Sequence, residues 1–128
     1  MSNDIFKLKE LEKLVGHRFN DPDVLRQALT HASLERSSWN VYERLEFLGD
    51  RVLGLVVSET LLKRFPNERE GQISRRYANL VKRDSLAVVA RKIKFGDYLL
   101  ISAGGEAAGA RESVTILSDA LEAVIGAL

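Results

Sequence analysis

The stretch Tyr42-Glu43-Arg44-Leu45-Glu46-Phe47-Leu48-Gly49-Asp50 places three acids at helical spacing within a largely apolar run. At about 100° per residue, Glu43, Glu46 and Asp50 fall within an arc of about 60° on one helix face. This stretch therefore predicts a helix that carries a row of carboxylates on one side.

A second run, Ile116-Leu117-Ser118-Asp119-Ala120-Leu121-Glu122-Ala123, repeats the pattern with Asp119 and Glu122. The face that carries the first acids continues through Leu53 and Val57, which are apolar. A solvated helix face would continue with polar residues instead. We therefore expect these acids to point toward the core rather than into bulk water.

Several charged carboxylates can share a poorly hydrated site only if positive charge lies between them. A hard divalent cation with oxygen ligands meets this need, and magnesium is the expected ion, with manganese as a substitute. The alternative is that the acids are ordinary surface residues of amphipathic helices.

The length of the chain indicates a single domain that covers residues 1–128. The chain contains no cysteine and has a formal net charge of +1. Thiolate metal sites, disulfides and cysteine nucleophiles are excluded. No apolar run reaches membrane-spanning length and the first residues do not open a signal peptide, so we expect a cytoplasmic protein without a membrane partner. The near-neutral charge indicates that a nucleic-acid substrate would need a second subunit or a basic domain to hold it.

Helical periodicity runs through the chain, with no strand alternation, and predicts an all-α fold. Asp21-Pro22 is a helix start, and Pro66 ends the longest helix, which we expect to be central. Loops are predicted at 35–40 and 103–109. The expected helices cover about 5–15, 22–31, 41–65, 71–81, 84–93 and 112–128.

Basic residues cluster at Arg75-Arg76 and Lys82-Arg83, on the fourth predicted helix and just after it. Arg75, Arg76 and Lys82 could contact phosphates if they border the acids, although such clusters are usually solvated. Arg44 could pair with a carboxylate on a neighbouring helix. His17 and His31 stand apart from the acids and are expected to be helix-end or packing residues.

The run Glu43 to Asp50 resembles the signature of the ribonuclease III family. Three further segments match that family in the same order along the chain, which makes a chance match improbable. They are Ala28-Leu29-Thr30-His31-Ala32-Ser33, Phe65-Pro66 with Glu70-Gly71-Gln72-Ile73-Ser74-Arg75, and Ile116 to Ala127 with its second acidic motif.

This resemblance implies an all-helical endonuclease domain that works as a homodimer on double-stranded RNA. The implied reaction is magnesium-dependent phosphodiester hydrolysis, which leaves 5′-phosphate and 3′-hydroxyl ends and needs no small-molecule cofactor. The implied roles are the processing of rRNA, mRNA and tRNA. One ion would generate hydroxide at neutral pH and a second would offset charge on the leaving oxygen.

Matching residue by residue assigns roles to the acids. The family's metal-binding quartet corresponds to Glu46, Asp50, Asp119 and Glu122, and its active-site pair to Asp50 and Glu122. Two auxiliary acids, Glu43 and Glu70, match positions near the RNA and the subunit interface. Arg44, Arg75 and Arg76 complete the set of candidate RNA or interface contacts.

The sequence departs from the family pattern at Arg51, where a small residue often stands, at Ser118, usually alanine, and at Tyr77, often arginine. The family's bacterial form continues into a double-stranded-RNA-binding domain that these 128 residues lack, and the chain stops within an apolar helical pattern. We therefore expect the chain to be a fragment of a longer protein.

Two hypotheses compete with the nuclease function. One is a catalytically silent RNA-binding relative, and the other is a dimerisation module whose acids pair with Arg44, Arg75 or Arg76.

Overall fold

The computed structural model describes residues 2–34 and 39–128, and in that range it contains helices and no β-strand. The all-α prediction is confirmed. The elements are α1 (Ser2–Val15), α2 (Pro22–Leu29), α3 (Trp39–Arg64), α4 (Glu70–Val81), α5 (Arg83–Lys92), α6 (Ala103–Ala107) and α7 (Val114–Ala127), with 3-10 turns η2 (Phe95–Tyr98) and η3 (Ala110–Glu112).

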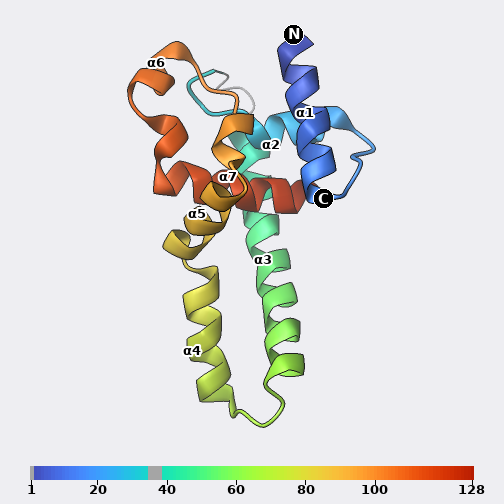
Figure 1. Cartoon of the computed structure of the whole chain (residues 1–128), viewed down its shortest axis with the longest axis vertical. Helices are drawn as coiled ribbons and strands as arrows, with labels where there is room; N and C mark the ends of the chain where they lie inside the picture. The colour runs from blue at the N-terminus through green and yellow to red at the C-terminus, as the bar shows by residue number, and fades with distance from the viewer. Residues whose placement is uncertain (1, 35–38) are drawn as a thin grey trace.

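Helix α7 lies across the first half of α3, with α1 and α2 on one side and α5 on the other (Figure 1). The second half of α3 and the antiparallel α4 extend from this body as a two-helix arm (Figure 1). The core gathers around α7 and includes Leu25, Leu29, Phe95, Leu117 and Val124. The helices around α7 thus hold α3 and α7 against each other, while the arm is formed by α3 packing against α4.

Helix starts follow the expected capping chemistry. The Asp21 carboxylate accepts a hydrogen bond from the Asp23 backbone N–H at 2.9 Å, and Pro22 occupies the first helical position of α2. Ser113 caps α7 by accepting from the Ile116 N–H at 3.3 Å. This cap fixes where α7 begins, and so where its two acids fall along the helix.

Two glycines set the distance between α3 and α7. A Cβ at Gly49 would overlap the backbone oxygen of Glu122, and a Cβ at Gly126 would overlap that of Leu45. The two backbones can therefore touch only because neither position has a side chain. Both contacts flank the acid-bearing turns of the two helices.

Helix α3 is central, as expected, and several of its large apolar side chains are exposed: Leu55 is 69% exposed and Phe47 and Leu62 are each 62% exposed. The structure corrects one loop prediction. The segment predicted as a loop at 103–109 contains helix α6, which Ser102 caps by accepting from the Gly105 N–H at 3.0 Å. The other predicted loop, 35–40, lies largely outside the described residues, and its last two positions belong to α3.

Candidate active site

The crossing of α3 and α7 brings four acids together. Glu46 shares a side-chain hydrogen bond with Asp119, and Asp50 shares one with Glu122. Two carboxyl groups can share such a bond only when one of them carries the proton. The structure therefore holds two carboxyl pairs, each made of one acid from α3 and one from α7.

Burial and neighbouring charge make Glu46, Asp119 and Glu122 hard to ionise. Partial burial, and then the charges of Asp119 and Glu43, raise the pKa of Glu46 to about 7. Partial burial, and then the charges of Asp50, Glu46 and Asp119, raise the pKa of Glu122 to about 7. Burial also raises the pKa of Asp119, against the opposing effect of Arg83. Added positive charge in this site would relieve the repulsion.

Three of the four acids, Glu46, Asp50 and Glu122, line a surface cleft of about 390 Å³, and Asp119 pairs with Glu46 beside it. Its lining includes Glu43, Glu46, Phe47, Asp50, Arg51 and Glu122. The Asp50 side chain is 48% exposed and that of Asp119 is 23% exposed. The expectation that all these acids face the core is therefore wrong, because the crossing of α3 and α7 leaves them at a rim that solvent reaches.

The carboxylates are close but not arranged around one point. Among residues 2–34 and 39–128, no group of three or more acidic, histidine or cysteine side chains is already positioned to hold a metal ion. Within each pair the two side chains share a hydrogen bond with each other.

Two arginines that the sequence did not connect with the acids lie beside them. Arg51 Nη1 lies 2.7 Å from Asp50 Oδ2, and its guanidinium stacks on the Phe47 ring at 4.0 Å. Arg83 Nη2 lies 3.7 Å from Asp119 Oδ1. In the described part of the chain, these arginines rather than Arg44 make the ion pairs with the four acids. Only the packing of α5 against α7 reveals the position of Arg83.

Two polar groups lie beneath the acids. Tyr42 is buried, and its burial together with the charges of Asp119, Glu46 and Glu122 raises the pKa of its hydroxyl well above the ordinary range. Ser118 is also buried, and its hydroxyl has no hydrogen-bond partner among the described residues. Ser118 therefore gives Asp119 no support through a hydrogen bond in this part of the structure.

The remaining candidates lie outside the cleft. Glu70 is the first residue of α4, at the far end of the arm, and accepts a hydrogen bond from the Ser74 hydroxyl at 2.7 Å. Arg75, on the same helix, is exposed. Arg76 is engaged at the α3–α4 connection, where it pairs with Glu68 at 2.7 Å and stacks on Phe65 at 3.7 Å. One copy of the chain therefore does not bring these residues to the acids.

The histidines behave as expected for turn and packing residues. His31 Nδ1 lies 2.8 Å from the Ser33 hydroxyl, and His17 packs edge-on against Phe19 at a centroid distance of 5.0 Å. Neither histidine lines the acid cleft.

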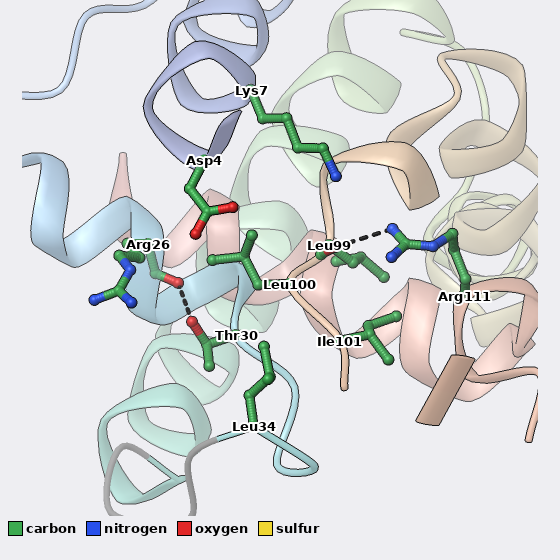
Figure 2. Close-up of a pocket in the computed structure, with 9 residues that line it drawn as sticks. All are labelled: Asp4, Lys7, Arg26, Thr30, Leu34, Leu99, Leu100, Ile101 and Arg111. Atoms are coloured by element: carbon green, nitrogen blue, oxygen red, sulfur yellow. Dashed lines mark hydrogen bonds between the residues drawn. The ribbon is translucent and has the colours of Figure 1, made fainter. Parts of the chain in front are cut away.

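A second cavity, of about 360 Å³, lies between α1, α2 and the segment around Leu100 (Figure 2). One of its lining cations, Arg111, donates to both Glu106 oxygens at 2.7 and 2.8 Å and to the Leu99 carbonyl at 2.9 Å. The guanidinium is thus committed to holding the loops around α6. This cavity shares no lining residue with the carboxylate cleft.

Comparison with known proteins identifies the class. The model of the Ribonuclease-III-like family matches residues 21–128, so the chain belongs to this family. Ribonuclease 3 of Histophilus somni is 46% identical over 122 residues, which cover 95% of this chain and 53% of that protein. Ribonuclease 3 of Ectopseudomonas mendocina is 48% identical over 121 residues, covering 94% of this chain and 52% of that protein.

The solved structures agree in fold. A crystal structure of the nuclease domain of ribonuclease III from Campylobacter jejuni superposes with a TM-score of 0.84 at 46% identity, covering 96% of this chain and 80% of that one. A second structure of that domain, described as showing flexibility in a region involved in dimer formation, gives a TM-score of 0.85 at 45% identity and covers 94% and 81%. The chain spans about half the length of the curated relatives it matches. No helix in the described residues is both long and apolar enough to cross a bilayer.

Proposed function

We propose that this chain is the catalytic domain of an endoribonuclease that hydrolyses phosphodiester bonds of double-stranded RNA in a magnesium-dependent reaction. The observation that carries the proposal is the pairing of Glu46 with Asp119 and of Asp50 with Glu122 where α3 crosses α7. Membership of the Ribonuclease-III-like family supports it independently. The proposed products carry 5′-phosphate and 3′-hydroxyl ends, and the proposed setting is cytoplasmic processing of rRNA, mRNA and tRNA.

The acid cleft fits a magnesium ion chemically. All four donors are carboxylate oxygens, which magnesium prefers. The raised pKa values of Glu46 and Glu122 show that the cleft disfavours a further negative charge, and a dication would remove that penalty. We therefore propose Glu46, Asp50, Asp119 and Glu122 as the ligands, with manganese as a substitute ion. Bound there, the ion would supply Lewis acidity for activating water and for offsetting charge on the leaving oxygen.

The chain's own residues supply position and charge. Asp50 and Glu122 come from different helices, and their side chains share a hydrogen bond. Once deprotonated, their oxygens are acceptors that can orient a water molecule within the cleft. Glu43 on the lining and Arg51 on the rim lie where an RNA backbone entering the cleft would pass.

We further propose that the chain acts as a homodimer through the exposed side of α3. Leu48, Leu55, Val56 and Leu62 all lie at least half exposed on this helix. Such a row of large apolar side chains marks an interaction surface more often than a solvated face. A dimer would provide two acid clefts, one for each strand of a duplex, and would bring the arm of each subunit, with Glu70, Arg75 and Arg76, toward its partner.

A cleavage assay on duplex RNA tests this function. The wild-type chain is expected to cut in magnesium and to stop in EDTA. Glu122→Gln is expected to reduce cleavage on the order of 100-fold or more, because loss of a ligand removes several kcal/mol of Lewis-acid stabilisation. Glu112→Gln removes an acid before α7 and serves as the matched control, with cleavage at the wild-type rate.

The assay also separates the rival hypotheses. Binding of duplex RNA by a dimer that never cuts it in magnesium would favour the catalytically silent relative. Loss of the helical circular dichroism signal in Glu122→Gln would instead indicate a structural role for that acid.

A further inference from the structure

We propose that Arg83 is an internal counter-ion of the carboxylate cleft, which neutralises Asp119 when no divalent cation is bound and competes with that cation for the same carboxylate. This inference rests on the proposed magnesium-dependent function. It adds a positioning residue that sets how tightly the cleft binds its ion.

The position of Arg83 is fixed by the packing of its helix. Arg83 is the first residue of α5, and Leu86, Ala87 and Ala90 of that helix are buried. These contacts anchor α5 in the body beside α7, so the arginine approaches Asp119 from a third helix (Figure 1). The guanidinium Nη2 then lies 3.7 Å from Asp119 Oδ1.

The charge of Arg83 reaches two of the four acids. It lies 3.7 Å from Asp119, and the Asp119 side chain shares a hydrogen bond with Glu46. These are the two members of one carboxyl pair. Arg83 therefore offsets part of the repulsion that a divalent cation would otherwise offset alone.

The exposure of the Arg83 side chain allows it to move away from Asp119. Its side chain is 58% exposed, whereas that of Asp119 is 23% exposed, so the arginine can swing into solvent while the acid stays in place. A separation of 3.7 Å is longer than a strong charge-assisted hydrogen bond. The pair is thus loose enough to open, and a cation that binds Asp119 must open it.

Arg51 provides a contrast. It pairs with Asp50 from the next position of the same helix and stacks on the exposed Phe47 ring. A change at Arg51 would therefore disturb the apolar surface of α3 as well as the charge of the cleft. Arg83 can be changed without touching that surface.

Isothermal titration of magnesium alone into the full chain at pH 8 tests the proposal. Arg83→Gln is expected to bind magnesium about three- to fivefold more tightly than the wild type, the size typical of a partly exposed ion pair. Lys92→Gln removes the same charge from the exposed last turn of α5 and is expected to keep the wild-type affinity. Arg83→Lys keeps the charge and is expected to stay near the wild type.

The outcomes distinguish this inference from the proposed function. Wild-type magnesium affinity in Arg83→Gln, with binding intact in all variants, would overturn the competition and leave the nuclease proposal standing. Unchanged magnesium affinity with weaker duplex-RNA binding would also overturn it, since Arg83 would then be a phosphate contact. Absence of magnesium binding in the wild type would overturn both proposals. Circular dichroism of each variant checks that α5 is intact.

Discussion

Glu46 and Glu122 make the folded state sensitive to pH. Their pKa values are about 7 in the folded chain and near the ordinary 4.5 once unfolded. Between these values the folded state binds more protons than the unfolded state, so stability falls as pH rises through this window. Thermal unfolding in EDTA should therefore give a lower midpoint at pH 8 than at pH 5.

Two comparisons isolate the acids as the cause. Magnesium should reduce the pH effect, because a cation in the cleft favours the deprotonated carboxylates. Glu46→Gln should reduce it as well, by removing one of the two groups that gain a proton. A midpoint that rises steadily from pH 5 to pH 8 in EDTA, with no difference between wild type and Glu46→Gln, would contradict this account.

The sequence predicts the acids better than their surroundings. Helical spacing placed Glu43, Glu46 and Asp50 on one helix face and Asp119 and Glu122 on another, and the resemblance to the ribonuclease III family then selected the quartet. The same spacing says nothing about which other helix lies opposite that face. Arg83 was visible only as a member of a basic cluster, since its approach to Asp119 depends on how α5 packs on α7.

At the scale of elements, the α3–α7 crossing depends on Gly49. Alanine there would push α3 away from the Glu122 backbone and separate the carboxyl pairs. We expect Gly49→Ala to cost about 1–3 kcal/mol in the free energy of unfolding, as overpacking does in a tight interface. We also expect weaker magnesium binding.

Gly71→Ala provides the control for this prediction. Gly71 lies in the first turn of α4, and a Cβ there would meet no atom within 4 Å. Since alanine favours a helix more than glycine does, this variant should match or exceed wild-type stability by up to about 1 kcal/mol. Urea unfolding checks both variants, and equal stability of Gly49→Ala and wild type would refute the close-contact argument.

Helix positions were predictable where capping residues and apolar periodicity agree, as at Asp21-Pro22 and along α3. Helix α6 was missed because Gly104 and Gly105 have low helix propensity. It forms because Ser102 caps it and because Glu106, near its end, pairs with Arg111 at 2.7 Å. Arg111 lies outside the helix, so no local pattern could predict the support it gives.

At the scale of the whole molecule, an exposed apolar row on α3 predicts self-association. Leu55, at 69% exposed, should lie inside the interface of a dimer that covers this face. An aspartate there would bury an unpaired charge, so Leu55→Asp is expected to weaken dimerisation by about 30- to 1000-fold, the range of interface hot spots. Sedimentation equilibrium measures this directly.

Leu14→Asp places the same change on α1, where the leucine is also exposed, and should leave the dimer intact. The monomeric Leu55→Asp chain should keep its fold and its magnesium affinity, because all four carboxylates belong to one copy. Its cleavage of duplex RNA should fall, since one cleft then acts alone and the partner's arm is absent. A Leu55→Asp chain that remains dimeric would place the subunit contact on another face, and a wild-type chain that is monomeric at all concentrations would remove the dimer from the mechanism.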